Sequence, residues 1–217
     1  MNRSHLAALS FSVLAVAAAA PVRAQGMTAP KPTFGVLAGL DLATLGGSDF
    51  SGVGSRTGLT LGGYVTFHLD RRFGLEPELM FTQRGASEES GGDRVTLKMD
   101  YIDVPVLARW DVPTSGQLHP FFLAGPTLSF EVSCNGEESQ GGASVSASCD
   151  DINAASPGSL SKKSFDLGAT LGGGIVFPAG KKTNLSIGIR YTHGLVATFD
   201  GSDAKNRTWQ FLAGMSF

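Results

Sequence analysis

The most constraining feature of this sequence is a repeated alternation of apolar residues with small or polar ones. Between Leu59 and His68, the odd-numbered positions are apolar or glycine, and the even-numbered positions are Thr, Gly, Tyr or His. A similar alternation runs through residues 73–84. A period of two residues is typical of a β-strand whose two faces meet different surroundings. The pattern therefore predicts an all-β chain.

The alternation recurs in several parts of the chain, and the connections between them differ in length in a regular way. The predicted strands are 34–42, 57–68, 73–84, 95–110, 120–132, 165–177, 184–197 and 207–217. Short connections at 69–72, 111–119 and 178–183 alternate with longer ones, rich in Gly, Ser and Asp, at 43–56, 85–94, 133–164 and 198–206. Outer-membrane barrels have short periplasmic turns and long outer loops. We therefore expect an eight-stranded antiparallel up-and-down transmembrane β-barrel.

Composition excludes several other classes of protein. The charged fraction is 17%, below the roughly 25% of soluble globular proteins. A net charge of -2 gives no basic field for nucleic acid. After Gln25 the sequence has no apolar run long enough for a transmembrane helix. Membrane lipid is the expected surroundings, and nucleic acid is not an expected partner.

Residues 1–24 are predicted to be a cleaved signal peptide. A short basic start is followed by an apolar run from Leu6 to Ala20, and Val22-Arg23-Ala24 offers small residues at the cleavage site. The run is shorter than the ~20 residues that a membrane helix needs. Cleavage would leave 25–217 as one barrel domain, exported to a bacterial outer membrane.

The strand faces can be assigned from the cost of exposing charge to lipid. A charge that faces the bilayer midplane costs about 2–4 kcal/mol, so charged residues within the strands should face the lumen. An eight-stranded barrel is just wide enough for side chains to fill, which favours mutual pairing over a narrow solute path or acid–base chemistry. The predicted polar network of the lumen is Asp41, Glu76, Glu78, Asp103, Arg109, Glu131, Asp166 and Arg190.

Cys134 and Cys149 are the two cysteines of the chain, and both follow the predicted signal. In an oxidising compartment they are expected to form a loop disulfide. A metal site is disfavoured because the sequence has no CxxC and no nearby His. The long connection 133–164 also holds Glu137, Glu138, Asp150 and Asp151, without the spacing of a calcium loop. We expect a solvated, mobile loop with no metal.

The C-terminal strand presents an apolar face made of Trp209, Phe211, Met215 and Phe217. Such a face is typical of the membrane-interface girdle and of the signal that the outer-membrane assembly machinery recognises. His193 lies on an outward row after Tyr191, where a lipid-facing hydrolase would also need a hydroxyl nucleophile and a carboxylate. His193-Gly194-Leu195 offers no hydroxyl, so neither a catalytic site nor a cofactor is expected.

Several motifs in order resemble the porin-family outer-membrane β-barrel domain of the PorT type. They are Tyr101–Leu107, Pro120–Pro126, Leu75–Leu79, Gln83–Gly85, Gly188–Tyr191 and the final Phe217. The resemblance covers the mature chain and implies an eight-stranded outer-membrane barrel, but little about activity. We expect a monomer with a structural or surface-interaction role, which binds an unknown extracellular ligand through its long loops. A narrow channel and a lipid-modifying enzyme remain the alternatives.

Overall fold

The computed structural model describes residues 31–47, 54–91, 93–141, 143–156, 163–199 and 203–217. These residues form nine strands and one short helix, α1 (Cys149–Ala155). The strands are β1 (Thr33–Gly46), β2 (Gly54–His68), β3 (Phe73–Ser90), β4 (Asp93–Asp111), β5 (His119–Gln140), β6 (Ala143–Ser148), β7 (Phe165–Pro178), β8 (Asn184–Gly194) and β9 (Lys205–Ser216). No helix among the described residues is long and apolar enough to cross a membrane.

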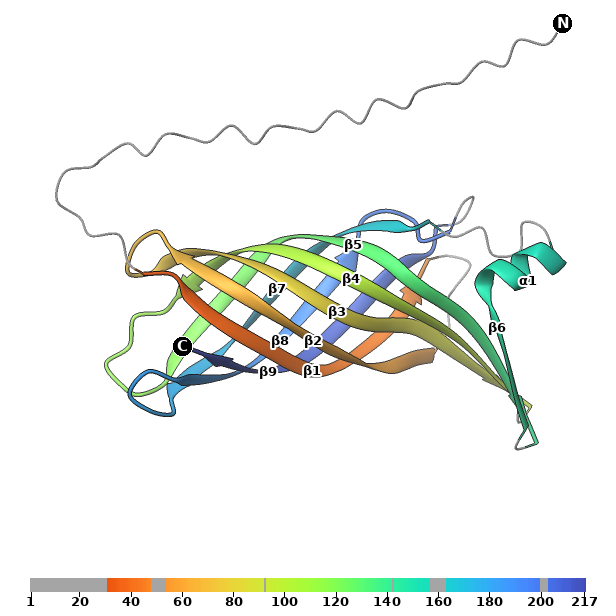
Figure 1. Ribbon diagram of the computed structural model, residues 1–217, viewed down its shortest axis with the longest axis horizontal. Helices are drawn as coiled ribbons and strands as arrows, with labels where there is room; N and C mark the ends of the chain where they lie inside the picture. The colour runs from red at the N-terminus through yellow and green to blue at the C-terminus, as the bar shows by residue number, and fades with distance from the viewer. Residues whose placement is uncertain (1–30, 48–53, 92, 142, 157–162, 200–202) are drawn as a thin grey trace, which may run out of the picture.

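Eight of the strands form a closed antiparallel barrel, which confirms the predicted fold. Each strand pairs with the next along the chain, except that β5 passes over β6 to pair with β7 (Figure 1). The barrel closes where β1 pairs with β9, with Asp41 opposite Gln210. Closure satisfies the backbone of every wall strand without leaving an open edge in lipid.

The two faces of the wall differ as the alternation predicts. In β9, exposed and buried residues alternate without interruption from Arg207 to Ser216. In β3, Leu79 is 62% exposed, while its neighbour Met80 is only 2% exposed. The exposed face is the one that meets lipid, so apolar residues line the outside and the lumen holds the polar side chains.

At the end away from the short turns, β3, β4 and β5 are longer than the sequence suggested. The predicted loop 85–94 is a hairpin between β3 and β4, and the predicted mobile loop 133–164 begins with the end of β5, β6 and α1. Glu137 and Glu138 therefore lie in β5, and Asp150 and Asp151 lie in α1. The expectation of a loop is therefore wrong for these four residues, since two lie in a strand and two in a helix. Elsewhere the limits shift less: β1 runs on to Gly46, and β8 ends at Gly194 instead of residue 197.

Gly-Gly pairs explain these two additional hairpins. Gly91 and Gly141 have positive φ angles of 63° and 57°, and each is followed by a second glycine in the sequence. Glycine adopts this backbone conformation without steric cost, and a Gly-Gly pair is a common two-residue hairpin turn. Both turns were visible in the sequence as turn signals.

Beyond the pair formed by Met99 and Cys134, at the end away from the short turns, β4 and β5 continue past the wall as a sheet with β6 and the end of β3. The first two β3 residues of this sheet, Ala86 and Ser87, still pair with β2. We call residues 86–91, 93–98, 135–141 and 143–155 the projection. It lies at the right of Figure 1, at the opposite end of the molecule from the C-terminus and the short turns. Short turns face the periplasm in outer-membrane barrels, and the projection lies at the end opposite the short turns.

Candidate functional site: the filled lumen and the projection

The lumen nearest the short turns is filled by an ion pair. Arg109 Nη1 donates to Glu76 Oε2 at 3.0 Å, and Arg109 Nε donates to Asp111 Oδ1 at 2.9 Å. The Thr66 hydroxyl donates to the same Glu76 carboxylate at 2.6 Å. The guanidinium also lies 4.1 Å from the ring centre of Phe121. These contacts satisfy a buried cation at the inner end of the polar cup that the short turns surround.

A second ion pair fills the next level of the lumen. Arg190 Nη1 donates to Glu78 Oε2 at 2.6 Å, and the two residues are 5% and 4% exposed. Nearby strands contribute hydroxyl groups that bond in a chain, Thr127 with Thr170 at 2.6 Å and Thr170 with Thr192 at 2.8 Å. Buried polar groups are costly unless they are hydrogen-bonded. At this level the three threonine hydroxyls and Glu78 Oε2 meet that condition, whereas Glu78 Oε1 has no hydrogen-bond partner among the described residues.

The third ion pair lies toward the projection and was missed by the sequence analysis. Arg84 is 2% exposed and forms a salt bridge with Asp103. It also donates to the Ser129 hydroxyl at 3.2 Å, and its guanidinium lies 5.0 Å from the ring centre of Tyr101. Arg84 shares its parity with Glu76 and Glu78 on β3, and that parity was the signal that could have found it.

The remaining predicted acids lie in the same part of the lumen, toward the projection. Asp166 accepts a hydrogen bond from the Asn206 amide at 2.7 Å. Asp41 is fully buried opposite Gln210, and Glu131 is partly buried at the start of an irregularity in β5. The structure thus buries seven of the predicted lumen residues and half-buries the eighth: Asp41, Glu76, Glu78, Asp103, Arg109, Asp166, Arg190 and Glu131.

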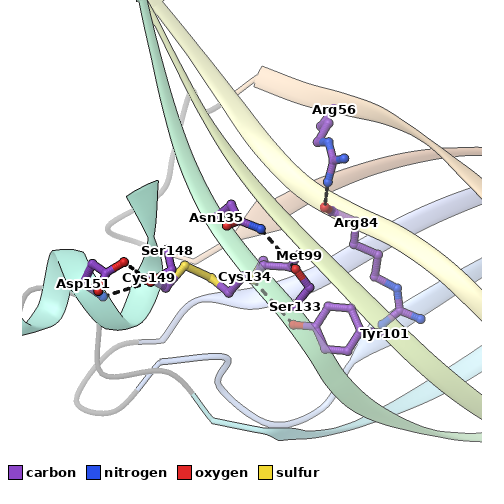
Figure 2. The surroundings of a disulfide bond; sticks show 10 residues. All are labelled: Arg56, Arg84, Met99, Tyr101, Ser133, Cys134, Asn135, Ser148, Cys149 and Asp151. Atoms are coloured by element: carbon purple, nitrogen blue, oxygen red, sulfur yellow. Dashed lines mark hydrogen bonds between the residues drawn. A yellow bond between two sulfur atoms is a disulfide. The ribbon is translucent and has the colours of Figure 1, made fainter. Parts of the chain in front are cut away.

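A buried hydrophobic cluster closes the lumen where the wall meets the projection. It contains Leu45, Ala86, Met99, Tyr101, Cys134, Cys149, Phe199 and Ala204. Figure 2 shows Met99 and Tyr101 near the disulfide, with the Arg84 side chain beside the Tyr101 ring. The cluster places apolar side chains between the polar network and the outside, as a cap.

The predicted disulfide is confirmed, but its surroundings differ from the prediction. Cys134 and Cys149 are bonded with their Cα atoms 5.4 Å apart. They are 6% and 1% exposed and belong to the cap, not to a solvated loop. Cys134 lies in β5 and Cys149 begins α1 (Figure 2). The disulfide therefore links the start of α1 to β5.

The helix α1 is also held by its own side chains. The Ser148 hydroxyl accepts the Asp151 N–H at 3.0 Å and caps the first turn. A Cβ atom at Gly136 would lie only 2.8 Å from Ile152 Cδ1, so glycine permits the close approach of α1 to β5. The projection is thus an ordered unit with a helix packed on its sheet.

At the opposite end, the short turns surround a polar cup of about 500 Å3. It is lined by side chains that include His68, Arg71, Arg109 and His119. The β2–β3 turn beside it is held by Asp70, which accepts the N–H groups of Arg72 at 2.6 Å and Phe73 at 2.8 Å. These bonds lower the pKa of the Asp70 carboxyl.

His193 lies in a contact that does not resemble a catalytic site. Its Nδ1 is 3.3 Å from the Tyr191 hydroxyl. A phenol is not the carboxylate that orients a catalytic histidine. Within the part of the chain that the structure describes, no group of three or more His, Cys, Asp or Glu side chains is placed to hold a metal ion.

The C-terminal apolar face lies on the outside of β9. Its residues Trp209, Phe211, Met215 and Phe217 are 47%, 46%, 40% and 61% exposed. Phe217 follows the strand and exchanges backbone hydrogen bonds with Phe34 at 2.9 and 3.3 Å. The last residue of the chain is therefore fixed at the seam that closes the barrel.

Comparison with known families agrees with this architecture. The family described as "Outer membrane protein beta-barrel domain" matches residues 24–200. The chain belongs to this family. It is accordingly a protein of the outer membrane, with the lipid-facing wall described above. A search of curated protein sequences finds no match.

Three solved structures of low sequence identity are similar to this chain. Neisserial surface protein A is 17% identical, with 84% of this chain and 95% of that chain covered and a TM-score of 0.49. Ail of Yersinia pestis is 17% identical, with 87% and 100% covered and a TM-score of 0.43. OprG of Pseudomonas aeruginosa is 14% identical, with 85% and 94% covered and a TM-score of 0.48. Similarity at this level carries no argument about function.

Proposed function

We propose that this protein is a non-enzymatic outer-membrane barrel that acts at the cell surface through its projection, with the barrel as its anchor. The observation that carries the proposal is the contrast between a filled lumen and an ordered outer sheet. Three buried ion pairs cross the lumen, and an apolar cluster caps it. The projection, by contrast, extends strands and a disulfide-tethered helix beyond the wall.

Two finer assignments follow from the sequence motifs. Within the family, the Tyr101–Leu107 and Pro120–Pro126 motifs favour the PorT-type group. The exposed face of Trp209, Phe211 and Met215, ending in Phe217, fits recognition by the outer-membrane assembly machinery. The signal peptide proposed for residues 1–24 lies outside the described residues. Mass spectrometry of the envelope fraction tests it, since the mature protein should begin at Gln25.

A lumen that is filled should not conduct ions, and planar bilayers test this directly. Purified protein with its disulfide intact should give no steady conductance. The alternative is a narrow channel, favoured by the polar cup of about 500 Å3 at the periplasmic end. Reproducible steps that change on Glu78→Gln, which weakens the pair with Arg190, would support the channel instead.

The orientation of the projection is tested on intact cells with a membrane-impermeant maleimide. Gln140→Cys places a thiol at the tip of the β5–β6 hairpin, and Thr114→Cys places one in the exposed β4–β5 turn at the other end. The first variant should be labelled on intact cells, and the second only after lysis. Labelling of Thr114→Cys alone on intact cells would overturn the assignment of the projection as the outer surface.

A further inference from the structure

The strand β6 ends the sheet of the projection. It pairs with β5 from Asn135 opposite Ser148 to Gln140 opposite Ala143. Among the described residues, no strand pairs with its other side. Such an edge leaves every second N–H and C=O group without a partner in the sheet, which makes it a template for another extended chain.

Sheet proteins often protect an edge of this kind with charged residues or proline, and β6 carries neither. Its sequence, Ala-Ser-Val-Ser-Ala-Ser, contains no charged residue and no proline. Its first four residues, 143–146, are exposed. Val145 at the centre is 73% exposed, although it is the largest apolar side chain of the strand. An uncharged, accessible edge with an apolar centre is a surface for pairing.

The sequence of the edge indicates which partner it fits. Residues 143–147 read Ala-Ser-Val-Ser-Ala, which is the same in both directions. In an antiparallel pair of two such strands, Val145 lies opposite Val145 of the second copy, and each Ser144 lies opposite a Ser146. A two-fold interface requires this self-complementarity. The edge meets the requirement with small side chains and without like charges opposite each other.

The neighbouring strands supply a surface that continues across such a pair. Val95 of β4 is 54% exposed and lies opposite Glu138 of β5, which in turn lies opposite Val145. Opposite residues share one face of an antiparallel sheet, so the two valines lie on the same face of the projection. Pairing about Val145 would cover its side chain with an identical β-branched side chain.

We propose that the free edge of β6 pairs with β6 of a second copy of this chain, which joins two projections into one continuous antiparallel sheet about a two-fold axis at Val145. This deepens the proposed function, since it takes the projection as the working surface and names its partner. The sequence led us to expect a monomer. That expectation considered only the closed barrel, which has no free strand edge, and β6 was not predicted.

Site-specific cross-linking of the full-length protein in micelles or lipid vesicles tests the pairing. Val145→Cys should form a dimer under mild oxidation, because opposite Cβ atoms in such a pair lie about 5 Å apart. Val95→Cys is the matched control, since it lies on the same face but in β4. The two Val95 positions in the dimer would be about five strand spacings, or roughly 24 Å, apart.

The cross-linking has outcomes that decide the proposal. Dimers of Val145→Cys with monomers of Val95→Cys support it. Folded Val145→Cys that stays monomeric, or equal dimer yields from both variants, would overturn it. If β6 instead pairs with a strand of another protein, folded Val145→Cys should stay monomeric. The native disulfide should be verified in each variant by mass spectrometry.

A charge exchange provides a second, independent test. Two like charges directly opposite each other destabilise a strand pair, while opposite charges support it. Val145→Lys and Val145→Glu should therefore each sediment as monomers, and their mixture should recover dimers. Failure of the mixture to associate, with both variants folded, would contradict a two-fold axis at Val145.

These experiments also separate this inference from the proposed function. A monomer with no conductance and a labelled Gln140→Cys would refute self-pairing alone. A dimer with steady conductance would refute the proposed anchoring role and leave the pairing of β6 intact.

Discussion

The wall of the barrel and the projection are built partly from the same three strands, yet they follow different rules. In the wall, β3, β4 and β5 have apolar side chains on one side and the filled lumen on the other, and each strand has a neighbour on both sides. In the projection, β6 pairs on one side among the described residues. Lipid requires closure and an apolar outer face; water requires neither. The difference teaches that the membrane determines where the alternation is strict.

The sharpest way to test this difference is to remove a cation from each region. Arg84→Met would leave Asp103 without its ion-pair partner in a buried site. Breaking a buried pair in this way costs about 3–5 kcal/mol. Arg94→Met in the projection breaks an exposed pair with Glu89 and should leave stability unchanged. Urea unfolding in lipid vesicles measures both variants.

The double variant Arg84→Met with Asp103→Leu controls for the lost charge. It removes both ions, so it should recover much of the stability that Arg84→Met loses. Equal losses from Arg84→Met and Arg94→Met would show that the lumen is hydrated like the surface, which would refute a filled interior.

An exposed apolar side chain should meet lipid in the wall and water in the projection. Leu79 in the wall and Val145 in the projection are 62% and 73% exposed. Leu79→Arg should destabilise the barrel by about 2–4 kcal/mol because its exposed face meets lipid. Val145→Arg should change the free energy of barrel unfolding by less than about 0.5 kcal/mol because its exposed face meets water. A large loss from Val145→Arg would place the projection in the membrane.

The same contrast explains what the sequence could predict. In the wall, lipid selects apolar residues at every second position, so β-strands, their faces and the closed barrel were all readable, as Leu79 and Met80 illustrate. The disulfide was readable because Cys134 and Cys149 are the two cysteines of an exported chain. These features each follow from a strong local constraint.

The projection could not be read by alternation because neither of its faces has to meet lipid. Residues 85–90, 93–94, 133–140 and 143–148 form strands through main-chain pairing, which does not require apolar side chains. Arg84 was missed for a related reason: Gln83 beside it is an outward polar residue at the point where the alternation fades. The glycine pairs beginning at Gly91 and Gly141 were the remaining signals.

Removing a side-chain hydrogen bond should also cost more stability in the lumen than on the projection, although the difference should be smaller. Thr127 is 2% exposed and bonds with Thr170 inside the lumen, so Thr127→Val should cost about 1 kcal/mol. Ser139 bonds with Ser144 on the projection at 2.8 Å, where water is available. Ser139→Ala should leave barrel unfolding within experimental error. If both substitutions are neutral in vesicle unfolding experiments, the hydroxyl chain of the lumen contributes no stability.

The smallest effect on the barrel should come from removing the disulfide, although its effect on the projection should be large. The bond closes a loop of 15 residues, which the chain-entropy model values at about 3 kcal/mol. That stabilisation belongs to α1 and β6, because the wall ladder closes without them. The variant Cys134→Ala with Cys149→Ala should keep heat-modifiable migration on gels, while protease cleaves residues 135–148 faster than in the native protein. Alanine avoids placing hydroxyls in the buried cap. Loss of the folded barrel would show that the cap stabilises the wall and that the two regions fold as one unit.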